Sequence, residues 1–179
     1  MDVQDQDGLA TLTTPEATKI ALVGTLVVAA AAVISYVTGP AEASATAGYL
    51  ALFTALFSLR VVGQIAVAAV RPSWLPPMEQ WNLVPYRILL PVQVALLALM
   101  SVIAFDVARG SGAFAEQNAT LGAVLVPLSY VYWAAMAGRY AVRMARGPGQ
   151  RWFGGAIPIV FHCVLAGFVF VYGSYLASG

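Results

Sequence analysis

Five long apolar stretches, separated by short polar segments, dominate the hydrophobicity pattern of this chain. Each is close to the ~20 residues that a helix needs to cross the hydrocarbon core of a bilayer. None shows the apolar–polar alternation of a barrel strand. The pattern predicts an all-α bundle of five transmembrane helices at about residues 19–38, 47–70, 87–108, 120–144 and 155–177.

Helix-breaking residues mark where these stretches end. Pro40 follows the first stretch, Pro72 the second and Pro148 the fourth. Residues 1–18 are polar and acidic, and they lack the basic n-region and cleavage site of a signal peptide. We therefore predict a mobile polar tail over 1–18 and a single transmembrane domain over 19–179.

Composition supports the membrane class and excludes several functions. Hydrophobic residues make up 60% of the 179 residues and charged residues 9%, and the mean hydropathy is +0.80. A typical soluble domain has about 25% charged residues. The chain has no room for a separate catalytic domain, and no run of Lys and Arg long enough to follow nucleic-acid phosphates, so we expect no nucleic-acid partner.

Basic residues predict the orientation in the membrane. Seven of the nine Lys and Arg residues fall on one side of the predicted bundle, and Arg109 alone lies in the opposite loops. Because cytoplasmic loops carry the excess of Lys and Arg, the N-terminus is predicted in the cytoplasm and the C-terminus outside. The short chain without targeting features favours a multi-pass protein of the bacterial inner (plasma) membrane. The seven residues are Lys19, Arg71, Arg87, Arg139, Arg143, Arg146 and Arg151.

Tryptophan and arginine residues on the predicted cytoplasmic side are typical of membrane interfaces. The loop RGPGQRWFGG, residues 146–155, mixes basic and aromatic residues. Such a loop binds anionic lipid headgroups with about 1 kcal/mol per basic residue, although the positive-inside orientation requires the same arginines. The predicted interface residues are Trp74, Trp81, Arg146, Arg151 and Trp152.

Arg60 lies near the middle of the second predicted helix. A charge at that depth costs roughly 2.5–3.5 kcal/mol on insertion scales. The predicted spans offer no Asp or Glu at a similar depth, because their one acid, Asp106, lies near the outer end of the third. A bound anion would offset the charge, for example a carboxylate, a phosphate headgroup or a quinone-like carbonyl. A partner chain or access to water are the alternatives.

Other polar residues are predicted at a similar depth. Gln64, Gln93 and His162 each lie about six residues from the cytoplasmic end of their helix. Arg60 shares a face with Gln64, because positions four apart stack on a helix. The fourth helix adds a stripe of polar residues that approaches from the cytoplasmic side. The sequence predicts a ligand-binding pocket in the inner half of the bundle, formed by Arg60, Gln64, Gln93, His162, Tyr132 and Arg139.

A packing role is the alternative to this pocket. Gln and His in membrane helices often only bond across helices, at an average of about 0.6 kcal/mol each. Ala137, Ala141 and Ala145 repeat at four-residue spacing, which predicts an internal or a subunit contact. Two functions remain. The protein binds or passes a small anionic or amphipathic ligand, or it is an accessory or assembly subunit that contacts partner subunits or its own copies.

Catalytic and metal-binding patterns are missing from the sequence. It has no Ser/His/Asp arrangement, no paired carboxylates at one depth, no Gly-rich phosphate loop and no HExxH, so we expect no enzyme. His162 is the only histidine and Cys163 the only cysteine, too few ligands for a zinc site. We predict no metal and no cofactor. Haem between two copies of His162 across a dimer is the one alternative.

Overall fold

Five α-helices make up almost all of the described structure. They are α1 (Glu16–Thr38), α2 (Ala43–Ala69), α3 (Tyr86–Arg109), α4 (Ala119–Arg146) and α5 (Ala156–Ala177). The computed structural model describes residues 16–39, 43–70, 75, 86–146 and 156–179.

The helices follow the predicted apolar stretches closely. The largest difference is in α2, which begins at Ala43 instead of residue 47. α1 begins at Glu16, so residues 16–18 belong to the helix and not to the predicted tail, and the rest of that tail lies outside the described residues. With 22 to 28 residues, α5 and α4 are about 33–42 Å long, more than the ~30 Å hydrocarbon core. Within the described residues, all five helices are long and apolar enough to cross a membrane.

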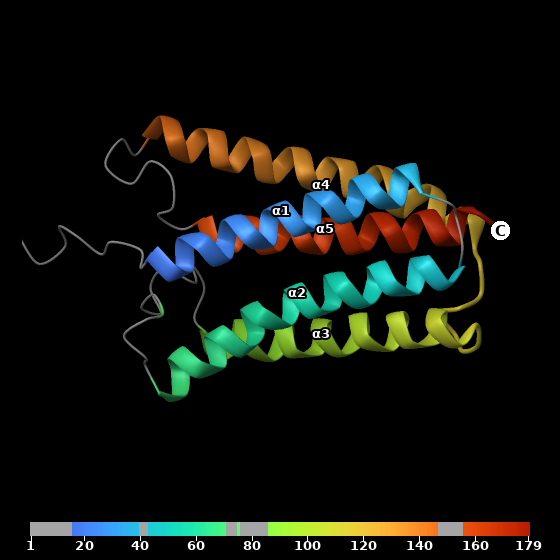
Figure 1. Ribbon diagram of the computed structural model, residues 1–179, viewed down its shortest axis with the longest axis horizontal. Helices are drawn as coiled ribbons and strands as arrows, with labels where there is room; N and C mark the ends of the chain where they lie inside the picture. Colours follow the sequence, from blue (N-terminus) through green and yellow to red (C-terminus); the bar gives the residue numbers. More distant parts are fainter. Residues whose placement is uncertain (1–15, 40–42, 71–74, 76–85, 147–155) are drawn as a thin grey trace, which may run out of the picture.

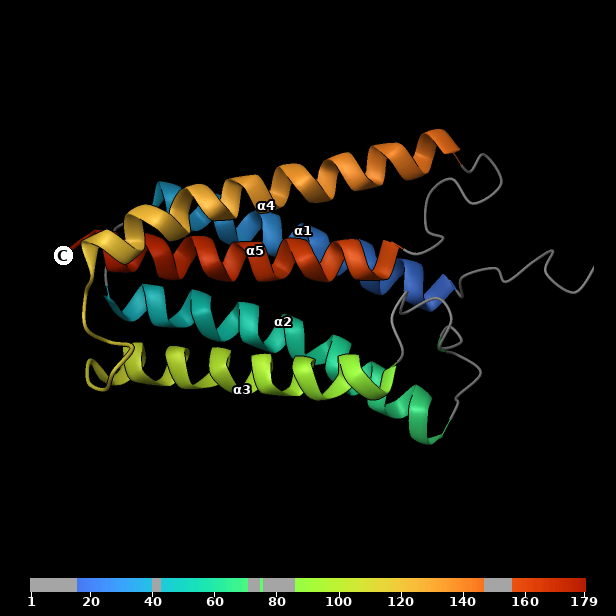
Figure 2. The same ribbon diagram turned by 180° about the vertical axis from the view of Figure 1, so that it is seen from behind.

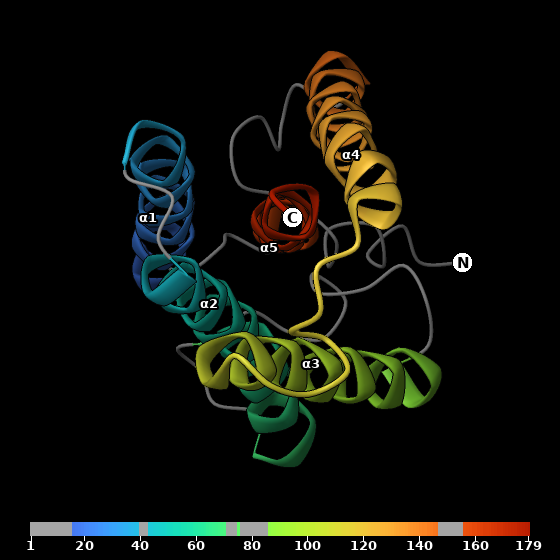
Figure 3. The same cartoon turned by 90° about the vertical axis from the view of Figure 1, so that its right-hand side faces the viewer.

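α5 lies in the centre of the bundle. Figure 3 looks along the bundle and shows α1, α2 and α4 around α5, with α3 on the far side of α2. The contacts agree, because α5 packs on α4, α2 and α1, whereas α3 packs mainly on α2. The sequence of α5 is apolar on all sides, as expected of a helix that other helices surround. Most of its residues are buried accordingly.

Successive helices run in opposite directions, which gives the bundle two distinct ends (Figure 1). At one end α1, α3 and α5 begin and α2 and α4 end. Lys19 and Arg143 lie near it, and we call it the basic end. Arg109 and the C-terminus lie at the opposite end, which we call the C-terminal end.

Large apolar side chains cover the outside of the bundle. On α1, Ile20, Val27 and Ile34 are all more than half exposed, and Phe105 of α3 and Val131 of α4 are exposed to a similar degree. A continuous apolar surface of this kind is unfavourable in water and favourable in lipid. The interior is a second apolar layer, centred on the fully buried Leu50, Phe53, Met100, Val164 and Val171.

α4 and α5 are closest near the C-terminal end. A Cβ atom added to Gly122 of α4 would lie 2.5 Å from Ala177 N and 2.7 Å from Gly173 O of α5. One added to Gly173 would lie 2.8 Å from Leu125 Cβ. Glycines at such contacts let two helix backbones approach each other closely.

Toward the basic end, α4 leaves α5 (Figures 1 and 2). The side chains of Ala137, Ala141 and Ala145 are exposed there, as are Ala134 and Gly138. The prediction that this four-residue repeat makes an internal contact is therefore wrong. Depth and spacing alone did not show that α4 tilts away from its neighbour. A subunit contact at this face stays a prediction.

Asp106 closes the loop between α3 and α4. Its Oδ2 accepts a hydrogen bond from Phe114 N at 3.2 Å. A side chain at Gly112, which has a φ of 111°, would collide with this carboxylate. Tyr175 of α5 holds the same loop by donating a hydrogen bond to Ala115 O at 2.7 Å. Asp106 therefore has a structural role at the C-terminal end, far from Arg60.

Candidate functional site

Arg60 is buried between three helices. Its side chain on α2 is only 4% exposed, and its neighbours Gln64 of α2 and Gln93 of α3 are buried as well. Gln93 Oε1 accepts hydrogen bonds from Arg60 Nε and Nη2, each at 3.2 Å, and Gln93 Nε2 donates to Gln64 Oε1. The amide of Gln93 is assigned with its oxygen toward Arg60, because this orientation satisfies both ends of the amide. The structure thus joins three of the predicted residues in one network.

The remaining contacts of Arg60 leave its charge only partly compensated. The guanidinium carbon lies 5.8 Å from the centroid of the Phe161 ring on α5, a cation–π contact worth about 0.5–2 kcal/mol. Nη1 is buried and has no hydrogen-bond partner among the described residues. The described part of the chain has three acids: Glu16 pairs with Lys19, Asp106 caps its loop, and Glu116 is exposed in the same loop, between α3 and α4. None of the three forms an ion pair with Arg60.

Tyr132 and His162 form a second polar contact, between α4 and α5. Tyr132 OH and His162 Nδ1 are 2.5 Å apart, and the tautomer of the histidine decides which atom donates. Both residues lie within electrostatic range of Arg60. Arg139 is close enough to act on His162, but its own side chain is exposed. The structure therefore places the predicted residues in two groups, Arg60 with Gln64 and Gln93, and the partly buried Tyr132 with His162, whereas Arg139 is exposed.

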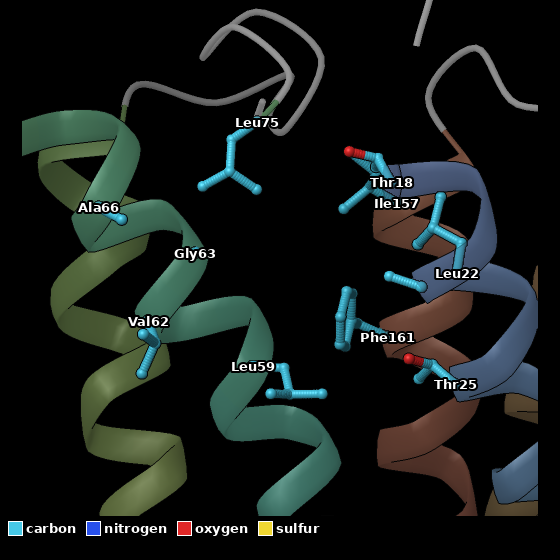
Figure 4. A pocket seen from close by; sticks show the side chains of 11 residues that line it. Thr18, Leu22, Thr25, Leu59, Val62, Gly63, Ala66, Leu75, Ile157 and Phe161 are labelled. Atoms are coloured by element: carbon cyan, nitrogen blue, oxygen red, sulfur yellow. The ribbon is translucent and has the colours of Figure 1, made fainter. Parts of the chain in front are cut away.

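An apolar pocket of about 300 Å³ lies beside this polar network, between α1, α2 and α5. Figure 4 shows Leu59, Val62, Gly63 and Ala66 of α2 on one wall and side chains of α1 and α5 on the other. Leu75 covers one end. The complete lining is Thr18, Ala21, Leu22, Thr25, Leu59, Val62, Gly63, Ala66, Leu75, Ile157 and Phe161.

Two hydroxyl groups are the polar features of this lining. Thr18 and Thr25 are seven residues apart on α1, and Figure 4 shows both side-chain oxygens toward the pocket. Thr18 Oγ1 is buried and has no hydrogen-bond partner within the described residues. Elsewhere in the bundle such hydroxyls bond to the carbonyl four residues earlier, as Thr54 does to Leu50 O at 2.8 Å.

Phe161 separates the pocket from the polar network. Its ring lines the pocket and also contacts the Arg60 guanidinium. On α2, Gly63 lines the pocket while the adjacent Gln64 belongs to the network. Reasoning from the sequence missed this pocket. The sequence features that could have indicated it are the small residues Gly63 and Ala66 on α2 and the repeated threonines of α1.

Four of the five predicted interface residues lie outside the described residues. The fifth, Arg146, is the last residue of α4. The other interface residues, Trp74, Trp81, Arg151 and Trp152, lie outside the described residues.

Among the described residues, no group of three or more His, Cys, Asp or Glu side chains is placed to hold a metal ion.

Comparisons with known proteins do not assign the chain to a family. No protein-family model, no curated protein and no solved structure matches it. Among the described residues, the site provides a buried cation, amide and phenol groups and, beside them, an apolar pocket.

Proposed function

We propose that this is a multi-pass membrane protein without enzymatic activity that binds a small amphipathic, anionic ligand in the basic half of its bundle. One observation carries the proposal. Among the described residues, the buried Arg60 has no hydrogen-bond partner for Nη1 and no carboxylate beside it, and a single aromatic ring lies between it and an apolar pocket. Ligand pockets usually combine a mostly apolar wall with few polar groups, in volumes of ~300–1,000 Å³.

The energetic argument concerns the cost of the buried charge. An arginine at the centre of a helix costs roughly 2.5–3.5 kcal/mol on insertion scales. Bonds between neutral groups across membrane helices return only about 0.6 kcal/mol each. If Arg60 served only for packing, an apolar residue of similar volume could replace it without a loss of stability. An anionic ligand supplies the charge that the described residues lack.

Replacing Arg60 by leucine tests this proposal. The wild-type protein, purified in mild detergent, is expected to retain one class of lipophilic anion, and Arg60→Leu is expected to lose it. Extraction followed by mass spectrometry measures the retained molecules. Arg109→Leu is the matched control, because Arg109 is exposed at the C-terminal end, where its guanidinium lies 5.1 Å from the centroid of the exposed Phe105 ring.

Two results would contradict ligand binding. One is the same set of retained molecules in the wild type, Arg60→Leu and Arg109→Leu. The other is an Arg60→Leu protein that is more stable than the wild type and fully replaces it in the cell. Either result would leave Arg60 without a role beyond packing.

The second candidate function is an accessory or assembly subunit of a larger membrane complex. The exposed small residues of α4 favour it, because Ala137, Gly138 and Ala141 would let a helix of another subunit approach closely. In this case a partner subunit remains bound to the wild-type protein in mild detergent and is lost from Ala141→Leu. The two functions are separated by whether Arg60→Leu or Ala141→Leu changes the bound molecules.

The orientation is part of the proposal. We propose a bacterial plasma-membrane protein with the basic end in the cytoplasm, based on the excess of Lys and Arg at that end. In a Cys163→Ser background, Ser111→Cys in the exposed α3–α4 loop is expected to react with a membrane-impermeant maleimide in intact cells. Ala145→Cys, exposed near the basic end, is expected to react only after permeabilisation. The reverse pattern of labelling would contradict this orientation.

A further inference from the structure

The size of the pocket indicates how many chains the ligand has. The pocket has a volume of about 300 Å³, at the lower end of the ~300–1,000 Å³ that is usual for small-molecule pockets. A pocket of this size favours a ligand with one alkyl chain over a phospholipid with two. Leu22, Leu59 and Ile157 in the pocket walls have apolar side chains, which suit an alkyl chain.

The headgroup follows from Arg60. Its Nη1 has no hydrogen-bond partner among the described residues, and Arg60 is only 4% exposed. A carboxylate is planar and accepts two parallel hydrogen bonds from a guanidinium, which also neutralises the charge. Because Arg60 is enclosed, the anion it meets has to be compact. A phosphodiester with its glycerol backbone is bulky, whereas a terminal carboxylate is small. The enclosed position of Arg60 therefore favours the carboxylate.

Phe161 has to move for the two parts of the ligand to bind together. Its ring lies between the pocket and the guanidinium, with the ring centroid 5.8 Å from the guanidinium carbon. Across the pocket lies Gly63, which adds no side chain to this part of the pocket (Figure 4). A turn of the ring away from the guanidinium would open the path from the pocket to Arg60 Nη1.

We propose that the ligand is a single-chain carboxylate of the fatty-acid type. Its alkyl chain fills the pocket between α1, α2 and α5, and its carboxylate binds Arg60 after Phe161 turns aside. This inference rests on the proposed function and narrows it to one ligand class. The neutral rival is a lipid alcohol of the same length. Its hydroxyl group would bond to Thr18 Oγ1, which has no partner in the part of the chain that the structure describes, and would not need Arg60.

Three ligands of equal length separate these possibilities. Hexadecanoic acid, hexadecanol and methyl hexadecanoate are titrated into the full chain in detergent micelles, and affinities are measured by displacement of a fluorescent fatty acid. The acid is expected to bind at least tenfold more tightly than the alcohol or the ester. Arg60→Met is expected to weaken binding of the acid at least tenfold and to leave the alcohol and the ester unchanged.

Pocket variants test where the chain lies. Gly63→Leu narrows the pocket and is expected to weaken binding of all three ligands. Gly24→Leu is the matched control, because Gly24 is exposed on α1 with no atom within 4 Å of an added Cβ, and it is expected to bind like the wild type. Phe161→Ala is expected to bind the acid faster and at least as tightly. Size-exclusion profiles confirm that each variant is folded.

The contradicting results differ for the two proposals. Equal affinity for the acid and the alcohol, lost in Thr18→Val and unchanged in Arg60→Met, would overturn the carboxylate and leave an amphipathic ligand in the pocket. Weaker binding of the acid to Phe161→Ala would overturn the role of the ring as a gate. If no ligand displaces the probe, and the molecules that co-purify are the same in Gly63→Leu and wild type, both proposals are wrong.

Discussion

Replacing Gln93 by leucine is expected to destabilise the bundle by about 3 kcal/mol, because the substitution removes the oxygen that accepts two hydrogen bonds from a buried cation. Gln93 Oε1 accepts from Arg60 Nε and Nη2, and hydrogen bonds to charged groups contribute about 1.5–3 kcal/mol each. Leucine leaves the guanidinium with the Phe161 ring as its main remaining contact. The measurement is the shift in the unfolding midpoint when sodium dodecyl sulfate is titrated into detergent-solubilised protein.

A double variant and a surface control complete this experiment. Arg60→Met combined with Gln93→Leu removes the charge together with its acceptor, and we expect a stability within about 1 kcal/mol of the wild type or above it. Gln117→Leu changes an exposed glutamine that donates to Ser178 Oγ at 3.2 Å, so its effect is expected to be small. If Gln93→Leu is no more destabilising than Gln117→Leu, Gln93 does not hold the charge of Arg60.

The polar network was predictable because helix geometry links position to depth. A rise of 1.5 Å per residue placed Gln64 and Gln93 at one level. The four-residue spacing placed Arg60 and Gln64 on one face. The structure joins the side chains of these three residues. The same reasoning brought His162 to a similar depth, and the structure adds that its partner is Tyr132.

The order of the helices was less accessible from the sequence. Lengths of apolar stretches and positions of helix breakers define where helices begin and end, but not which helices touch. α3 and α4 follow each other in the chain, yet their main contacts are with α2 and α5, respectively. The one available signal was α5, whose apolar residues point in all directions around its axis.

The pocket was not predictable because it is a property of three helices at once. Gly63 and Ala66 are small on one side, but small residues equally allow close helix packing. Whether space remains between α1 and α2 depends on how both helices rest on α5, which side-chain packing decides. The role of Phe161 was not predictable either. Phe161 is one of many aromatic residues in the chain, and its position in the sequence did not indicate that its ring lies between the pocket and the Arg60 guanidinium.

Replacing Gly122 by leucine is expected to have the second large effect, because it forces α4 and α5 apart where their backbones are closest. An added Cβ atom would meet Ala177 N at 2.5 Å, Gly173 O at 2.7 Å and Ala177 Cα at 2.8 Å. All three are backbone atoms, which cannot rotate away as a side chain can. Overpacking usually costs 1–3 kcal/mol, and we expect about 3 kcal/mol or more here. The same detergent titration measures the loss.

The matched control for this prediction lies on the same helix. An added Cβ at Gly138 meets no atom within 4 Å, and the residue is exposed where α4 has left α5. Gly138→Leu is therefore expected to unfold at the wild-type midpoint or slightly above it, since leucine favours a helix more than glycine does. Equal destabilisation by the two substitutions would mean that the loss comes from leucine itself and not from the contact with α5. A stable Gly122→Leu protein would show that α4 and α5 are not held together at this point.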